Sequence, residues 1–188
     1  MTHITMLDRK VIACTDDVFS AEECAVLYEQ FQKTAFYRCE ADFPGSPYKS
    51  FVNRTATKDE PWYSASERLQ EHAQSISAQP LEFLYDLLGC ATYGEHYVPH
   101  HDSTEPGHVT ALLYLNPVWK TEWYGETMFY SRETPEILSF LPRPGRVLVF
   151  DSLLYHRVGI PSRDCPDSRA TLVIKLRASR SDNQRSSP

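Results

Sequence analysis

The feature that most constrains this chain is a histidine and an aspartate two residues apart, His100 and Asp102. In an extended strand, residues i and i+2 point to the same side, so one imidazole and one carboxylate would face the same space. A second imidazole, His156, comes more than fifty residues later, just after the strand-like run Val147–Phe150. These three side chains predict a metal site with two imidazole ligands and one carboxylate ligand.

The His-x-Asp pair alone is weak evidence, because random shuffling would produce one in roughly two chains in five of this composition. Its context is more specific. The pair closes a segment, Ala91–Val98, that reads as a strand, and Arg169 opens another strand-like run. A guanidinium on such a strand can pair with a carboxylate through two hydrogen bonds. Two histidines and one carboxylate on one face of a metal leave the opposite face open, as in non-haem Fe(II) oxygenases.

These residues lie in a region, from about Thr92 to Leu176, that resembles the 2-oxoglutarate/Fe(II)-dependent dioxygenases of the prolyl 4-hydroxylase-like group. Besides the four residues above, the resemblance is carried by Thr110–Asn116, Gly125–Thr127 and Pro144–Phe150. It implies an α+β protein with a double-stranded β-helix (a jelly-roll or cupin-like core) and the metal at the open end of that core. It also implies Fe(II), the cosubstrate 2-oxoglutarate and O2, with ascorbate as the reductant in vitro.

The resemblance also implies roles for particular side chains. His100, Asp102 and His156 would bind the metal and form the catalytic centre. Arg169 would bind the distal carboxylate of 2-oxoglutarate, with Tyr114 as the preferred hydroxyl donor to the cosubstrate and Thr110 as a second candidate. Related iron halogenases lack the carboxylate ligand, so Asp102 favours hydroxylation or another oxidation such as desaturation.

Two departures from the family pattern stand out. Tyr124-Gly125 replaces a frequent Gly-Gly, and we expect the bulkier residue to reshape the pocket wall. A polar loop, Pro161–Ser168, lengthens the spacing between His156 and Arg169. Lys175 falls on the same strand face as Arg169, where it could project into the barrel near the cosubstrate, although we expect it to be solvated or to cap the strand. His101 should point away from His100 and is rejected as a ligand.

The substrate is not specified by any motif. Candidates for contacts at the pocket rim are Arg54, Trp123, Tyr124, Glu126 and Tyr130. The chain is small and has no appended peptide-binding domain, which favours a free small molecule such as an amino acid or a biosynthetic intermediate. Two alternatives stay open: a prolyl-hydroxylase-like enzyme acting on a peptide or protein side chain, which a wide groove lined by Ala41–Thr57 would favour, and a non-catalytic β-helix binding module.

The composition is that of a soluble globular protein. The 188 residues carry a net charge of -6, which argues against a large nucleic-acid interface. No run approaches the roughly 20 apolar residues that span a bilayer. The five cysteines are odd in number and form no Cys-x-x-Cys pair, so we expect free thiols and a cytoplasmic location. The sequence does not predict an oligomeric state.

The N-terminal half shows mainly helical signals. Val11–Cys14 reads as a short strand. Ser20 with Glu23 forms a capping box that predicts a helix whose apolar face contains Cys24, Leu27, Tyr28 and Phe31. Proline and glycine predict a loop over Ala41–Tyr48, and Ser50–Thr55 reads as a strand or a gate over the pocket.

Two more helices are expected before the β-rich half. Ser64 with Glu67 predicts a second capping box and a helix to about Ser77, and Pro80 predicts a helix that Gly89 ends. We therefore expect one domain over residues 1–178, with helical support over 1–90 and a catalytic β-helix core over 91–178. The polar residues 179–188 predict a disordered tail.

Overall fold

The computed structural model describes residues 1–40, 49–54 and 59–179. These residues contain two α-helices, one short 3-10 helix and eleven strands. Their bounds in chain order are β1 Thr2–Leu7, β2 Lys10–Thr15, α1 Ala21–Lys33, β3 Tyr37–Glu40, β4 Lys49–Asn53, α2 Trp62–Ile76, β5 Leu81–Ala91, β6 His108–Tyr114, η2 Thr121–Trp123, β7 Thr127–Tyr130, β8 Ile137–Phe140, β9 Val147–Asp151, β10 His156–Val158 and β11 Arg169–Ala178.

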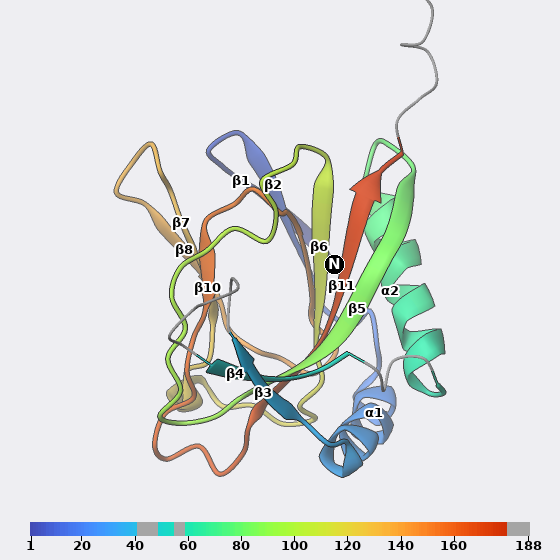
Figure 1. Cartoon of the computed structure of the whole chain (residues 1–188), viewed down its shortest axis with the longest axis vertical. Coiled ribbons are helices and arrows are strands. Elements are labelled where there is room, and N and C mark those ends of the chain that lie inside the picture. The colour runs from blue at the N-terminus through green and yellow to red at the C-terminus, as the bar shows by residue number, and fades with distance from the viewer. Residues whose placement is uncertain (41–48, 55–58, 180–188) are drawn as a thin grey trace, which may run out of the picture.

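The strands form two antiparallel sheets that face each other (Figure 1). The larger sheet has the order β1-β2-β9-β6-β11-β5-β4-β3, and the smaller sheet has the order β10-β7-β8. Strands distant in sequence, such as β6 and β11, lie side by side at the centre of the larger sheet. This arrangement is the double-stranded β-helix that the sequence predicted.

Successive side chains of a strand point to opposite faces, so the central strands give the larger sheet an outer and an inner face. On β11, the apolar side chains of Ala170, Leu172, Ile174 and Leu176 belong to the hydrophobic cluster under the helices. The residues between them, Arg169, Thr171, Val173 and Lys175, line the space between the two sheets. The same period places Leu113 outside, while Thr110 and Leu112 line the inner space on β6.

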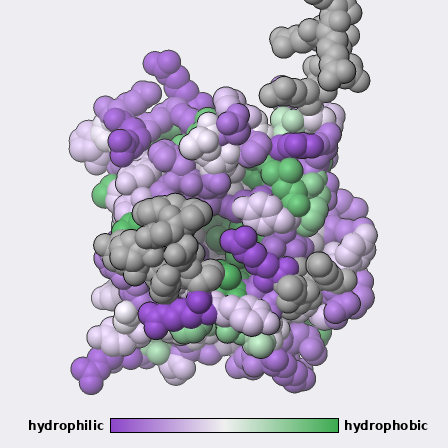
Figure 2. Space-filling model, viewed as in Figure 1, coloured by the Kyte–Doolittle hydropathy of each residue, from purple (hydrophilic) through white to green (hydrophobic). Residues whose placement is uncertain are grey.

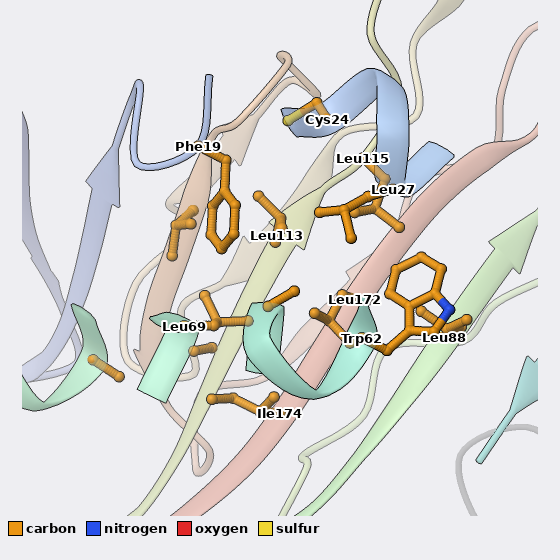
Figure 3. Packing of buried hydrophobic residues seen from close by; sticks show 14 of the residues in the cluster. Phe19, Cys24, Leu27, Trp62, Leu69, Leu88, Leu113, Leu115, Leu172 and Ile174 are labelled. Atoms are coloured by element: carbon orange, nitrogen blue, oxygen red, sulfur yellow. The ribbon is translucent and has the colours of Figure 1, made fainter. Parts of the chain in front are cut away.

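The helices cover the outer face of the larger sheet (Figure 3). The predicted capping box is present at α1, where the Ser20 hydroxyl accepts from the Glu23 amide and the Glu23 carboxylate accepts from the Ser20 amide. The predicted apolar face of α1 is also buried. Leu69 of α2 is fully buried, and each such leucine contributes about 1.5–3 kcal/mol through removal of its surface from water. Neither α1 nor α2 combines the length and apolarity that a membrane-spanning helix requires.

The helix predicted to start at Pro80 is wrong, because Leu81–Ala91 forms strand β5. This strand pairs with β11 along its whole length, with one register shift at Lys175/Leu176. Leucines spaced three and four apart suit a helix, but here tertiary pairing overrides the local pattern. Gly89 lies inside the strand instead of ending a helix, and a Cβ there would lie 2.9 Å from the Thr171 hydroxyl.

Three other local predictions need correction or qualification. Helix α2 starts at Trp62, and Ser64 lies inside it with its hydroxyl bonded to Glu60, so the second capping box is absent. Strand β5 ends at Ala91, so the strand predicted over Ala91–Val98 is not formed. The described part of residues 1–91 contains five strands besides α1 and α2, so the support predicted over 1–90 is not purely helical. The predicted loop 41–48 and Thr55 fall outside the described residues, and the predicted strand near Ser50 is β4.

The Pro144-Gly145-Arg146 turn ties the strands to the start of α1. Gly145 has a positive φ of 68°, and a Cβ there would lie 2.0 Å from the carbonyl oxygen of Phe19. The Arg146 guanidinium next to it donates to both carboxylate oxygens of Asp16, at 2.6 and 3.0 Å. The glycine is therefore required both by backbone conformation and by a backbone contact.

Gly145→Ala should lower the free energy of unfolding by at least about 3 kcal/mol, because left-handed backbone strain adds to a clash with an immobile carbonyl. Gly94→Ala is the matched control, since Gly94 also has a positive φ but a Cβ there would have no neighbouring atom within 4 Å. It should cost about 1–2 kcal/mol. Urea unfolding would measure both, and equal losses would contradict the role of the Phe19 contact.

Candidate metal centre and cosubstrate pocket

The inner faces of the sheets enclose a cavity of about 230 Å³. Its lining includes the predicted site residues His100, Asp102, Thr110, His156 and Arg169. Apolar atoms are visible near the middle of the face shown in Figure 2, between hydrophilic side chains. The strands of the β-helix thus bring His100 and Arg169, which are 69 positions apart (100 to 169), into one pocket.

The three predicted metal ligands form one cluster. One ligand atom from each of His100, Asp102 and His156 lies within 4.8 Å of the other two. The Nε2 atoms of His100 and His156 are 3.7 and 3.5 Å from the Asp102 carboxylate oxygens. His101 is outside this cluster, since its Nδ1 lies 2.7 Å from the Leu153 carbonyl, and the prediction that it is no ligand agrees with this geometry.

Backbone hydrogen bonds fix the two histidines relative to each other. The amide of His100 donates to the carbonyl of His156 at 2.8 Å, and the amide of His156 donates back at 2.9 Å. This antiparallel bridge connects the irregular segment after β5 to the start of β10. It holds the two imidazole rings with their centroids 4.7 Å apart.

The tautomers of both histidines suit metal binding. Nδ1 of His100 lies 3.0 Å from the Val98 carbonyl, and Nδ1 of His156 lies 2.9 Å from the Leu154 carbonyl. A carbonyl only accepts, so each Nδ1 carries the proton and each Nε2 keeps its lone pair. Hydrogen bonds of this kind orient imidazole ligands in metalloproteins.

The protonation states also match a divalent metal. Burial lowers the pKa of the His156 imidazole to about 4, so this ring is neutral at pH 7. Burial raises the pKa of Asp102, but the adjacent Lys175 ammonium outweighs it and holds that pKa well below its usual value. A neutral imidazole and an ionised carboxylate bind metal without first releasing a proton.

Arg169 lies at another part of the same cavity and is almost completely buried. Its Nε donates to the Gly125 carbonyl at 2.6 Å, and one terminal nitrogen donates to the Thr127 hydroxyl at 2.9 Å. No carboxylate in the described part of the chain forms an ion pair with it. A buried guanidinium without an anion is costly, so this arrangement suits an anionic ligand.

Tyr114 lies against this arginine, with the Arg169 guanidinium carbon 4.9 Å from the centre of its ring. The Tyr114 hydroxyl donates to the Phe140 carbonyl at 3.1 Å and shares a hydrogen bond with Thr127 at 2.6 Å. Thr127, which the sequence did not single out, therefore links the two residues predicted to bind the cosubstrate. Its position as the last residue of the matched Gly125–Thr127 segment was the available signal.

Thr110 and Lys175 contact the metal cluster directly. The Thr110 hydroxyl donates to Oδ2 of Asp102 at 2.6 Å, so it contacts the candidate carboxylate ligand, and its contact with the cosubstrate stays a prediction. The ammonium of Lys175 forms an ion pair with the same oxygen. The expectation that Lys175 is solvated or caps the strand is therefore wrong, because its side chain is only 12% exposed.

The predicted substrate residues divide into two groups. Arg54 lines the cavity, with its guanidinium 5.9 Å from the centre of the Tyr85 ring. The other four lie outside the cavity lining: Trp123, Tyr124, Glu126 and Tyr130. Tyr124 is 58% exposed and has φ 56° and ψ -134°, a conformation that glycine adopts most easily, so it does not reshape the pocket wall. Tyr85 was missed because its strand was read as a helix.

Comparison with known proteins agrees with this geometry. Residues 88–177 match the family model described as the 2OG-Fe(II) oxygenase superfamily. These residues form a 2OG-Fe(II) oxygenase domain. The matched segment contains all three clustered ligands and Arg169. No curated protein matches the chain.

Solved structures share the fold of this oxygenase at low sequence identity. HygX from Streptomyces hygroscopicus, with nickel and 2-oxoglutarate bound, has a TM-score of 0.67 and 14% identity, covering 94% of this chain and 90% of its own. A Pseudomonas putida prolyl-4-hydroxylase has a TM-score of 0.65 and 16% identity, covering 90% and 93%. A Trichoplax adhaerens prolyl hydroxylase in complex with a hypoxia inducible factor peptide has a TM-score of 0.67 and 17% identity, covering 89% and 83%.

The oxygenase is therefore a 2-oxoglutarate-dependent Fe(II) enzyme of the kind that the sequence predicted, with Fe(II), 2-oxoglutarate and O2 as its requirements. The residues present fit this chemistry, because the donor set is two imidazoles and one carboxylate. The buried cation of Arg169 supplies the complementary charge for a dicarboxylate cosubstrate.

Replacing His100, which belongs to the cluster, should weaken metal binding, whereas replacing the adjacent His101 should not. We expect His100→Ala to weaken Mn(II) binding at least about 100-fold, because one of three ligands is lost. His101→Ala is the matched control and should bind Mn(II) within about twofold of the wild type, since its ring is directed at Leu153. Calorimetric titration with Mn(II) under anaerobic conditions measures both, and similar losses in the two variants would contradict the assigned cluster.

Proposed function

We propose that this enzyme hydroxylates an unactivated C–H bond of a small molecule, such as an amino acid or a biosynthetic intermediate. The overall reaction converts substrate, 2-oxoglutarate and O2 into hydroxylated product, succinate and CO2. The observation that carries the proposal is one cavity that contains both the His100, Asp102 and His156 cluster and the buried guanidinium of Arg169, which pairs with no carboxylate among the described residues.

In this proposal the side chains of the chain bind and orient the reactants. His100, Asp102 and His156 hold Fe(II) on one face, and the metal with 2-oxoglutarate supplies the oxidising chemistry. Arg169 binds the distal carboxylate of 2-oxoglutarate, and its own contacts with Gly125 and Thr127 keep the guanidinium in one pose. Tyr114 supports that pose through its ring, while its hydroxyl is engaged by the Phe140 carbonyl and Thr127.

The apolar wall of the cavity excludes water from the reacting centre. Leu87, Leu112, Phe150, Val158 and Val173 contribute to this wall. Exclusion of water strengthens the electrostatic contacts inside the site and protects reactive species from side reactions. Because Asp102 supplies the carboxylate ligand that related halogenases lack, hydroxylation or a related oxidation is favoured over halogenation.

A small-molecule substrate is supported by the size of the described cavity, about 230 Å³, which must also hold the cosubstrate. HygX has been solved with hygromycin B bound, and the epimerase SnoN with nogalamycin RO. Arg54 and Tyr85 line the cavity on the strands β4–β5 side and are our candidates for substrate contacts.

A peptide or protein side chain is the second candidate substrate. A neighbouring groove of about 610 Å³ shares Arg54 and Tyr85 with the metal cavity and also contains Tyr63 and Phe83. These three aromatic side chains are between 43% and 52% exposed, as suits contact with an extended chain. The prediction that Ala41–Thr57 lines a peptide groove falls largely outside the described residues.

The function is tested by measuring succinate from the purified protein with Fe(II), ascorbate and 2-oxoglutarate. We expect slow succinate release without substrate and faster release when a true substrate is added from a panel of amino acids, biosynthetic intermediates and short peptides. The class of compound that stimulates release decides between the two candidates. Absence of both succinate release and 2-oxoglutarate binding would overturn the proposal.

Arg169→Ala should weaken 2-oxoglutarate binding to the Mn(II)-loaded protein at least about 100-fold, because a charge-assisted bidentate contact in a buried site is lost. Mn(II) affinity should change less than about threefold, since Arg169 contacts none of the three ligands. Arg157→Ala removes a guanidinium outside this cavity and is the matched control. Calorimetry measures both affinities, and equal losses of metal and cosubstrate would contradict the role of Arg169.

A further inference from the structure

Lys175 is a buried cation in direct contact with a metal ligand. Its Nζ contacts Oδ2 of Asp102 and donates to the Thr110 hydroxyl at 3.0 Å. It lies on β11, on the inner face that also carries Arg169. A buried ammonium needs strong partners to offset its lost hydration, and these two oxygens provide them.

The two oxygens of the Asp102 carboxylate therefore have different surroundings. Oδ2 lies 3.5 Å from Nε2 of His156, accepts a hydrogen bond from Thr110 at 2.6 Å and pairs with Lys175. Oδ1 lies 3.7 Å from Nε2 of His100 and accepts no hydrogen bond from the residues that the structure describes. Oδ1 keeps its lone pairs for a metal, whereas those of Oδ2 are engaged.

We propose that Lys175, together with Thr110, is a positioning residue that holds Oδ2 away from the metal and makes Asp102 a one-oxygen ligand. This inference rests on the proposed function. A carboxylate bound through both oxygens would occupy one of the three positions that the cosubstrate and O2 need. Lys175 thus protects the open face of the metal.

Electrostatics separate this role from one in metal affinity. An ammonium next to a divalent cation repels it, so Lys175 does not serve to tighten metal binding. Removing its charge should leave the metal bound as tightly or more tightly, while the cosubstrate loses a position. A merely structural role would weaken metal and cosubstrate together.

The test compares Lys175→Met with Arg177→Met. Arg177 lies on the same strand, and its exposed guanidinium pairs with Glu82. We expect Lys175→Met to bind Mn(II) at least as tightly as the wild type and 2-oxoglutarate about 10- to 100-fold more weakly. Arg177→Met should match the wild type in both. Wild-type affinity for 2-oxoglutarate in Lys175→Met would overturn the inference.

Infrared difference spectra of metal binding report the ligation mode directly, with the aspartate carboxylates labelled with a heavy carbon isotope. The two carboxylate stretches are further apart for one-oxygen than for two-oxygen ligation. We expect the wide separation in the wild type and a narrower one in Lys175→Met. An unchanged separation would also overturn the inference.

Thr110 supplies an independent pair of variants if Lys175→Met does not fold. Thr110→Val removes the second donor to Oδ2 and should shift the spectrum and the 2-oxoglutarate affinity in the same direction as Lys175→Met. Thr110→Ser keeps the hydroxyl and should behave as the wild type. Equal behaviour of the two Thr110 variants contradicts the proposal, whereas a wild-type protein that binds neither Mn(II) nor 2-oxoglutarate contradicts the proposed function itself.

Discussion

The site depends on one small element, the backbone bridge between His100 and His156. Two hydrogen bonds, of 2.8 and 2.9 Å, join a segment without regular structure to the first residue of β10. Asp102 follows two residues later, and its amide donates to the Ser152 carbonyl at 3.0 Å, which fixes the same segment a second time. Without these contacts nothing would hold the segment that carries His100 and Asp102 next to His156.

Strand β11 carries both the stability of the fold and the charge of the site. Its outer residues pack under the helices, and its inner residues include two buried cations, Arg169 and Lys175. Buried charges cost free energy, so a sheet optimised for stability alone would not contain them. Here one cation pairs with the carboxylate ligand, and the other is held by neutral acceptors. Local rules of stability are commonly broken at functional sites in this way.

The sequence predicted that His100, Asp102 and His156 lie together, and the structure brings them into one cluster. His156 and Arg169 lie at the starts of β10 and β11, next to runs of apolar residues that identify strands. The strand over Ala91–Val98 was wrong, yet His100 and Asp102 still reach one site through the bridge. Spacing and order were therefore more informative than the local secondary structure.

Other features could not be predicted because they depend on contacts between distant residues. Lys175 reads as an ordinary surface lysine until β11 places it opposite Thr110 of β6 and beside Asp102. Strand β5 has helix-like leucine spacing, and only pairing with β11 makes it a strand. The aromatic residue Tyr124 looked like a pocket residue, but its backbone conformation turns it toward solvent.

The central claim is that one metal and one 2-oxoglutarate occupy this cavity together. The most direct measurement is a crystal structure of the protein with Mn(II) and 2-oxoglutarate, with the metal located by its anomalous signal. We expect Mn(II) bound by Nε2 of His100, Oδ1 of Asp102 and Nε2 of His156, with the distal carboxylate of 2-oxoglutarate on Arg169. A metal at any other place, or a distal carboxylate that does not contact Arg169, would contradict it.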